Sequence, residues 1–311
     1  MKRRQLVLIG VLLAGAVLLY LPRLLSDSEG RGSLSIPDGF SFQVSEPVTR
    51  VDVVELANGR TFRLERAAPE WTVDGHRADM PKIETMLTAI GDLSSDAIVA
   101  RNPTNHEALG VGDSNGRRID VYTEGGGPYS FHLGDRDLGA GGYFVRVPDS
   151  AEVFRLDGPV GGFLSRDRDG WRQRVIARVN VDAVRDIMIR RSAGEIVIRR
   201  EDDGWSIDGR AADSSTVQGI LALLPAVSAS DFPTDEEAAA VDFSTPDAEL
   251  DVFAEGGTDV TDRELVLGLR FVQDTAAGDW LVRTVDGSEV YRLAPFTARR
   301  LIPERTELLP E

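Results

Sequence analysis

Two stretches of the chain place apolar residues at the spacing of an amphipathic helix. In each stretch four apolar residues follow the i, i+3, i+4, i+7 pattern, which gathers them on one helical face. Asp79 precedes the first stretch and Asp213 the second, and each carboxylate is suited to cap a helix. The same face is therefore predicted to be buried twice. The apolar residues are Ile83, Met86, Leu87 and Ile90 in the first stretch and Val217, Ile220, Leu221 and Leu224 in the second.

Apolar and polar residues alternate ahead of both predicted helices. A period of two places one side of a strand on a core and the other side in water, so these segments are predicted to be half-buried β-strands. The matched apolar residues, each pair 134 residues apart, are Phe62 and Ile196, Leu64 and Ile198, and Val53 and Ile187.

The segment between strand and helix occurs twice in nearly the same form. Residues 71–79 read Trp-Thr-Val-Asp-Gly-His-Arg-Ala-Asp, and residues 205–213 read Trp-Ser-Ile-Asp-Gly-Arg-Ala-Ala-Asp. The Asp-Gly pair predicts a tight hairpin turn. A second match joins residues 152–156 to residues 289–293, both Glu-Val-aromatic-Arg-Leu. Two matches in the same order at so long a period predict two domain-sized copies of one module.

The predicted fold class is therefore α+β: an N-terminal transmembrane helix followed by two tandem repeats of an antiparallel sheet with one packed helix. We expect the first repeat over 47–168 and the second over 181–303. A basic junction over 169–180 separates them, and 304–311 is expected to be a C-terminal tail.

The N-terminus carries the pattern of a membrane anchor. No charge occurs in 5–22, and basic residues at 2–4 precede this run. At about 1.5 Å per residue the run spans roughly 27 Å, close to the thickness of a bilayer core. We expect a cytoplasmic stub and transmembrane anchor over 1–25, followed by a tether over 26–46.

The basic flank predicts that the N-terminus stays inside. The expected location is the inner (cytoplasmic) membrane, with a single pass and with most of the chain periplasmic or otherwise extracytoplasmic. A cleaved signal peptide is the alternative, but it needs a small-x-small site after its apolar core. Ala-Gly-Ala at 14–16 falls inside the apolar run, and the Tyr-Leu-Pro-Arg sequence at 20–23, where the run ends, offers no such site.

Composition excludes several classes of protein. The 311 residues carry a formal net charge of -16, so nucleic acid is not an expected partner. There is no cysteine, which excludes disulfides, cysteine-ligated zinc and cysteine nucleophiles. The histidines, His76, His106 and His132, lack the local spacing of a zinc site, and the Asp-x-Asp pairs lack further calcium ligands. We expect no cofactor, no metal and no catalytic residue.

The order of these features resembles a known family. A basic start and one apolar segment precede the Trp-x-x-Asp-Gly-x-x-Ala-Asp motif, an amphipathic helix, Ala-Leu-Gly-Val at 108–111 and Arg-Asp-Arg at 166–168. This pattern is similar to that of the bacterial domain-of-unknown-function family 4340. The resemblance implies an envelope protein encoded beside ABC-type transport systems. Its implied partner is an ABC-type transporter permease or a gliding-motility-like auxiliary subunit, and it supplies no catalytic residues.

A basic island at the expected junction is the candidate partner-docking site. Arginine and tryptophan are favoured anchors at protein interfaces, although the same arginines can instead pair with acidic groups of the modules. Trp71 and Trp205, at matched positions in the repeat, are expected in the cores. The candidate docking residues are Arg166, Arg168, Trp171, Arg172, Arg174 and Arg178.

The leading hypothesis is a non-enzymatic, membrane-anchored extracytoplasmic accessory protein that assists an ABC-type transport or envelope assembly. The alternative is a periplasmic ligand-binding module for a glycan, a lipid or a peptide. An unrecognised hydrolase is third, because serine, histidine and aspartate of a triad need no proximity in sequence.

Overall fold

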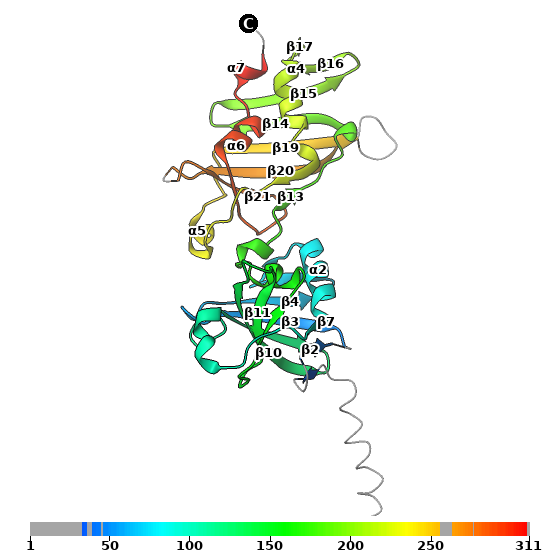
Figure 1. Ribbon diagram of the computed structural model, residues 1–311. Helices are drawn as coiled ribbons and strands as arrows, with labels where there is room; N and C mark the ends of the chain where they lie inside the picture. The colour runs from blue at the N-terminus through cyan, green and yellow to red at the C-terminus, as the bar shows by residue number, and fades with distance from the viewer. Residues whose placement is uncertain (1–32, 36–38, 45, 256–262, 276, 310–311) are drawn as a thin grey trace, which may run out of the picture. The chain divides into compact units, whose positions relative to one another are not determined.

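Figure 1 shows a computed structural model, which describes residues 33–35, 39–44, 46–255, 263–275 and 277–309. The chain divides into two compact units, unit 1 ending at Arg172 and unit 2 beginning at Gln173. The expected anchor, 5–22, lies outside the described residues. Over the residues that are described, no helix is long and apolar enough to cross a membrane.

Unit 1 contains a nine-stranded antiparallel sheet in the order β6-β5-β4-β3-β9-β10-β11-β12-β8. A smaller sheet, β1-β2-β7, packs beside it. The strands are β1 (Ser33–Ser35), β2 (Phe40–Gln43), β3 (Val48–Glu55), β4 (Thr61–Ala67), β5 (Glu70–Val73), β6 (His76–Arg77), β7 (Asp92–Ser95), β8 (Ile98–Ala100), β9 (Arg117–Thr123), β10 (Gly126–Arg136), β11 (Tyr143–Arg146) and β12 (Val153–Leu156). The helices are α2 (Met80–Ile90), η1 (Pro103–Asn105), η2 (Glu107–Leu109), α3 (Val160–Leu164) and η3 (Asp169–Trp171).

Unit 2 contains an eight-stranded sheet in the order β17-β16-β15-β14-β19-β20-β21-β22, with β13-β18 beside it. Its strands are β13 (Val175–Ala177), β14 (Val184–Arg191), β15 (Gly194–Glu201), β16 (Gly204–Ile207), β17 (Arg210–Ala211), β18 (Val227–Ser228), β19 (Ala248–Glu255), β20 (Arg263–Gln273), β21 (Trp280–Thr284) and β22 (Tyr291–Leu293). Its helices are η4 (Val181–Ala183), α4 (Ser214–Leu221), η5 (Leu224–Ala226), α5 (Asp235–Ala240), α6 (Pro295–Leu301) and α7 (Arg305–Leu308).

The two large sheets share one strand order. The order from β6 to β12 in unit 1 matches, strand for strand, the order from β17 to β22 in unit 2. All their pairings are antiparallel, and helices are few and short. The predicted α+β class is confirmed at this level: two large antiparallel sheets with a few packed helices.

The helices α2 and α4 bury the predicted face. Ile83 and Ile90 of α2 and Ile220 of α4 are fully buried. At the start of α4 the Asp213 carboxylate accepts a hydrogen bond from the backbone N–H of Thr216 at 2.8 Å, as expected for a cap. The capping prediction for the other helix is wrong.

Asp79 precedes α2 but makes no capping hydrogen bond with its side chain. Its carboxylate instead lies 3.0 Å from Nζ of Lys82 in an ion pair. The Asp79 carboxylate, which would have accepted from the free N–H groups of the first turn, is therefore paired with the ammonium group of Lys82.

Both Asp-Gly turns have the backbone that a tight hairpin requires. Asp74 and Gly75 have φ values of 48° and 85°, and Asp208 and Gly209 have values of 52° and 75°. Positive φ at both central positions is the signature of a type I′ turn, whose twist matches that of the flanking strands.

The register of the first hairpin corrects one predicted match. Val53 pairs with Phe62, and the residue that pairs with Ile196 is Ile189, not Ile187. Val53 therefore corresponds to Ile189. The connection between β14 and β15 is shorter than that between β3 and β4, so a constant offset along the sequence misplaces this strand by two residues.

The expected tether, 26–46, is wrong over its described C-terminal part. Phe40 and Phe42 of β2 are 1% and 0% exposed and belong to the core of unit 1. β2 pairs with β7, and β13 pairs in the same way with β18 in unit 2. Two phenylalanines separated by one serine supply a buried strand face, so the folded unit begins before Pro47.

The expected C-terminal tail, 304–311, also contains folded structure. Leu308 of α7 is fully buried in the core of unit 2. The backbone N–H of Asp213 donates to its carbonyl at 2.8 Å. Two adjacent leucines in an otherwise mostly polar stretch give no periodic signal, which is why the sequence predicts a tail here.

Each large sheet has an inner face, which packs against α2 or α4, and an outer face opposite. A small apolar cluster lies on each outer face. In unit 1 it comprises Ala100, Val111 and Val153, with Leu109 of η2 packed against it. In unit 2 the cluster is Phe243, Leu281 and Val290, with Ala238 of α5 packed against it. In each unit the segment that leads into the central strand, β9 or β19, therefore covers part of the outer face. Much of the remaining outer face carries polar or charged side chains.

Candidate functional site

The uncovered outer face of unit 1 contains a hollow of about 530 Å³. It lies over β3, β4, β5 and β9, whose outward residues alternate with core residues such as Val53 and Val121. Most of its lining is polar or charged. The lining residues are Asp52, Val54, Thr61, Phe62, Arg63, Glu65, Thr72, Asp74, Gly75, Arg118, Asp120 and Tyr122.

Ion pairs organise the side of the hollow formed by β3 and β4. Nε of Arg63 donates to the Asp52 carboxylate at 2.9 Å, and Nε of Arg50 lies 3.4 Å from its other oxygen. The hydrogen bond between Arg63 and Asp52 raises the pKa of Arg63 above its usual value. The guanidinium of Arg50 also stacks on Tyr122, 3.6 Å from the ring centroid. These contacts hold the wall of the hollow in one arrangement.

Asp120, at the centre of β9, is 6% exposed. The hydroxyl of Ser130 donates to one carboxylate oxygen at 2.6 Å, and Nε of Arg118 donates to the other at 3.0 Å. Both oxygens of this buried carboxylate therefore have hydrogen-bond partners, which hold the side chain in place beside the hollow.

His132 and Arg146 fasten the covering segment to the sheet. Nδ1 of His132 lies 3.1 Å from the carbonyl of Gly112, and Nε of Arg146 donates to the carbonyl of Val111 at 2.7 Å. Arg146 also donates to Asp113 at 2.6 Å. Burial, followed by the charge of Arg146, lowers the pKa of His132.

These groups are not arranged as a nucleophile and its base. Ser130 donates to Asp120, while Nδ1 of His132 faces a carbonyl and Arg146, so neither activates the other. Over the described part of the chain, no three histidine or acidic side chains are grouped so that they could hold a metal ion. What the arrangement can do chemically is bind a polar group.

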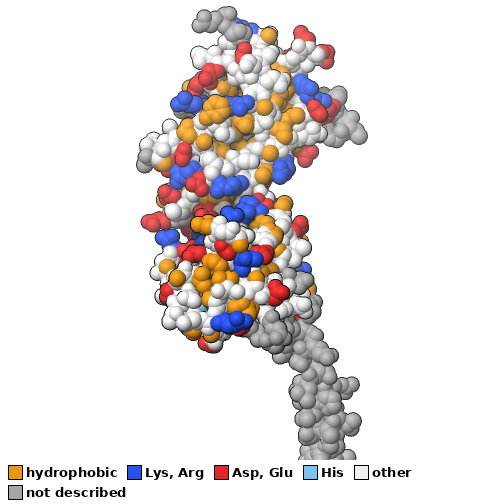
Figure 2. Space-filling view, viewed as in Figure 1, with side chains coloured by type: hydrophobic (Ala, Val, Ile, Leu, Met, Phe, Trp, Pro, Cys, Tyr) orange, Lys and Arg blue, Asp and Glu red, His pale blue; other side chains and the backbone are white. Residues whose placement is uncertain are grey.

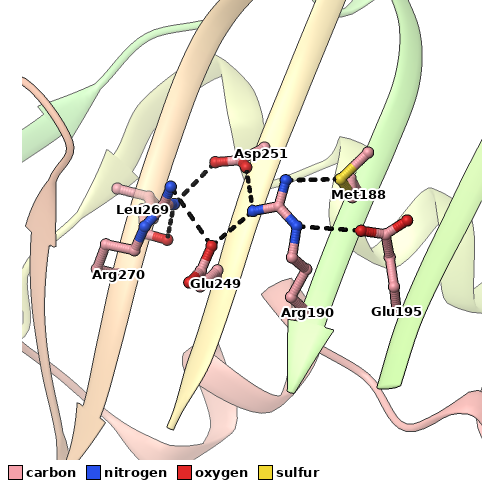
Figure 3. A network of polar contacts seen from close by, with 7 residues as sticks. All are labelled: Met188, Arg190, Glu195, Glu249, Asp251, Leu269 and Arg270. Atoms are coloured by element: carbon pink, nitrogen blue, oxygen red, sulfur yellow. Dashed lines mark hydrogen bonds and ion pairs between the residues drawn. The ribbon is translucent and has the colours of Figure 1, made fainter. Parts of the chain in front are cut away.

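Figure 3 shows the corresponding part of the outer face of unit 2. Arg190 of β14 reaches across to β19, where it donates to Glu249 at 2.6 Å and to Asp251 at 2.9 Å. Arg270 of β20 donates to the other oxygen of Asp251 at 2.8 Å. Glu195 of β15 accepts a hydrogen bond from Nε of Arg190 at 3.1 Å. Side chains of unit 2 itself thus form a continuous charged network over this face.

The predicted docking site is corrected at two of its six residues. Trp171 is fully buried, and Arg172 is 2% exposed. Arg172 forms an antiparallel bridge with Ala78, and its guanidinium lies 3.2 Å from Nδ1 of His76 and 3.4 Å from Asp169. These two side chains belong to the interior of unit 1, because the chain closes its core at this point.

The other four residues are divided between the units. Arg166 and Arg168 belong to unit 1, where Arg166 lies 5.1 Å from the ring centroid of Phe163. Arg174 and Arg178 belong to unit 2. Arg174 donates to the carbonyl of Ser230 at 2.6 Å, and Arg178 is exposed. The structure does not gather the six residues into one described surface.

Sequence reasoning missed the hollow. Its residues are scattered from Asp52 to Tyr122 and come together only through the pairing of β3 with β4 and β9. The available signal was the alternation of charged residues with core residues in those strands, such as Asp52 between Val51 and Val53.

A family model described as "Domain of unknown function (DUF4340)" matches residues 71–246, more than half of the chain. The chain belongs to this family. The match begins at Trp71, in the hairpin of unit 1, and extends into unit 2. No curated protein sequence and no solved structure matches the chain significantly.

Proposed function

We propose that this DUF4340 protein is a non-enzymatic, membrane-anchored extracytoplasmic accessory protein whose unit 1 binds a partner protein at the hollow. The observation that carries the proposal is the hollow itself, an open, charged depression on the outer face of the sheet. Arg63 and Arg118 on its wall keep 48% and 43% of their side-chain surface exposed. An open site of this kind suits a side chain of a large partner better than an enclosed small molecule.

The two units are proposed to be tandem copies of one module. Besides the shared strand order, the loops after β10 and β20 have the same hydrogen bonds. Asp137 N–H donates to the Gly142 carbonyl at 3.1 Å, and Asp274 N–H donates to the Asp279 carbonyl at 2.9 Å. In a duplicated scaffold the features that differ between the copies are the candidates for function, and the hollow of unit 1 is the feature on which this proposal rests.

The predicted anchor over 5–22 completes the proposal. An anchored module has a high effective concentration against a membrane partner, so a modest binding surface suffices. The class of partner implied by the family resemblance is an ABC-type transporter permease or a gliding-motility-like auxiliary subunit. Acidic and basic side chains are interspersed on the visible face of both units (Figure 2), which favours a specific partner over general attraction to anionic lipid.

Site-specific photo-crosslinking in native membranes tests this proposal. Thr72 lines the hollow, and Ser206 occupies the matched position on β16 of unit 2. A photoreactive phenylalanine at Thr72 is expected to form an adduct with a transport or envelope membrane protein. The same group at Ser206 is the control and is expected to form little of that adduct.

Two outcomes would contradict the proposal. One is the absence of any adduct specific to Thr72. The other is a different location of the full-length protein. Alkaline carbonate would then extract the protein from membranes, or a protease would cleave units 1 and 2 only from the cytoplasmic side. Either would remove the partner or the anchored, extracytoplasmic location.

A further inference from the structure

One position on the outer face differs between the units in a way that explains the hollow. Val54 of β3 pairs with Thr61, and Arg190 of β14 pairs with Glu195. On the other side Val54 opposes Arg118 of β9, and Arg190 opposes Glu249 of β19. Val54 and Arg190 are therefore equivalent in register, and so are Thr61 and Glu195. Both Val54 and Thr61 line the hollow.

In unit 2 this position holds a guanidinium against carboxylates. Arg190 contacts Glu195, Glu249 and Asp251 at 2.6 to 3.1 Å. The Asp251 side chain is only 6% exposed and also accepts from Arg270. An arginine side chain lying across the strands at this register is thus compatible with the geometry of the sheet.

Unit 1 retains the buried carboxylate but has no arginine at either cross-strand position; Arg118, which stands where unit 2 has Glu249, donates to this carboxylate from its own strand. Asp120 stands where unit 2 has Asp251, and its side chain is 9% exposed. Val54 and His132 occupy the positions of Arg190 and Arg270. The space that Arg190 fills in unit 2 is left open in unit 1.

The charge of the lining indicates what complements that space. The hollow is lined by four acidic residues and two arginines, so its walls carry an excess of negative charge. An incoming cation is favoured, and an incoming anion is opposed. A guanidinium fits better than an ammonium group, because its planar fork can contact carboxylates on two strands at once. The acidic residues are Asp52, Glu65, Asp74 and Asp120.

We propose that the hollow of unit 1 receives an arginine side chain of the partner protein at the register that Arg190 occupies in unit 2, with the acidic side chains that line the hollow as its partners. This inference rests on the proposed function, that the outer face of unit 1 binds a partner. Unit 2 supplies its own arginine at this register, whereas unit 1 has Val54 there and receives the arginine from the partner.

A transplant between the units provides the test variant. The double substitution Val54→Arg and Thr61→Glu places the Arg190–Glu195 pair of unit 2 in unit 1 and fills the hollow. The matched controls are Val54→Thr, which leaves the hollow open, and Leu138→Arg, which introduces an arginine at a residue that is 92% exposed. Circular dichroism and urea denaturation check that each variant folds.

The probe is a fluorescent peptide that carries two arginines spaced by glycine, titrated against full-length protein in detergent by fluorescence anisotropy. A peptide with citrulline in place of arginine keeps the shape but removes the charge. We expect the double variant, and the citrulline peptide on the native protein, to lose about tenfold or more in affinity. Val54→Thr and Leu138→Arg should stay within about twofold. Should the double variant fail to fold, Glu65→Gln, at an exposed residue of the lining, is expected to weaken binding about threefold.

Three results would overturn the inference: no binding of the arginine peptide, equal binding of the citrulline peptide, or equal binding by the filled variant. Free argininamide that binds as tightly as the peptide would also overturn it, by assigning the hollow to a small ligand. If the Thr72 adduct forms but the arginine peptide does not bind, the proposed function stands. Only the inference that the hollow receives an arginine is then rejected. Loss of the adduct removes the proposed function itself.

Discussion

The backbone N–H of Asp79 donates a hydrogen bond of 2.8 Å to the carbonyl of Trp171, joining the start of α2 to the last turn of unit 1. Asp213 makes the same bond, also 2.8 Å, to Leu308 at the end of unit 2. Trp171 and Leu308 are both fully buried. Each unit therefore closes by a hydrogen bond between its last fully buried apolar residue and the residue before its helix, and Trp171 belongs to the core of unit 1.

Replacing either closing residue should destabilise its own unit. We expect Trp171→Ala to lower the free energy of unfolding of unit 1 by about 3–5 kcal/mol, and Leu308→Ala to lower that of unit 2 by about 2–5 kcal/mol, because each leaves a cavity. Hydrogen–deuterium exchange of the full chain separates the two effects, through faster exchange in α2 or in α4. Arg178→Ala, at an exposed residue, is the control and should change stability by less than about 0.5 kcal/mol. Slower or unchanged exchange in α2 of Trp171→Ala would contradict the core role.

A second prediction concerns the close approach of α3 to β11. A Cβ at Gly161 would lie 2.2 Å from Cδ2 of Tyr143, so the ring leaves no room for a side chain. We expect Gly161→Ala to destabilise unit 1 by about 1–3 kcal/mol in urea denaturation, because the helix or the ring must move. Adding Tyr143→Ser should recover part of that loss by removing the ring. A Gly161→Ala protein as stable as the native one would show that the contact is looser than described.

The helices and the Asp-Gly hairpins were predictable because their signals are local. The spacing of Ile83 and Met86 defines a buried face within one turn, and Asp74-Gly75 defines its turn without help from the rest of the chain. The strand β2 also carried a local signal, since Phe40 and Phe42 alternate with polar residues. That signal was hidden by the serine, glycine and proline around it, which predict a tether.

Long-range pairing explains what the sequence could not reveal. The burial of Arg172 depends on a bridge to Ala78, and five arginines within a short stretch predict a surface. The hollow depends on the register of four strands, β3, β4, β5 and β9, and on the presence of a valine rather than an arginine at position 54. The valine at position 54 can be compared with Arg190 only after the pairing of β14 with β15 shows that the two residues are equivalent.

The charged network of unit 2 should contribute to stability mainly through Asp251. Asp251→Ala leaves Arg190 and Arg270 with one fewer carboxylate on a partly buried face, so we expect a loss of about 2 kcal/mol in the free energy of unfolding. Glu249→Ala should cost about 1 kcal/mol or less, because that carboxylate is more exposed and better solvated. Urea denaturation at low salt and at about 1 M salt tests whether these losses are electrostatic. Screening by salt should reduce the loss of unfolding free energy caused by Glu249→Ala more than the loss caused by Asp251→Ala. Equal effects of the two substitutions would argue against a special role for the buried carboxylate.

His132 should make unit 1 less stable as the pH falls. Burial, and then the nearby charge of Arg146, lowers its pKa in the folded state, against about 6.5 in the unfolded chain. The unfolded state therefore binds the proton first, and the free energy of unfolding decreases as the pH drops below about 6.5, until the folded-state pKa is passed. We expect His132→Gln, which keeps a polar side chain but does not titrate, to flatten this part of the stability profile. An NMR titration of the imidazole gives the direct measurement. A midpoint at or above about 6.5 would contradict the environment described for this residue.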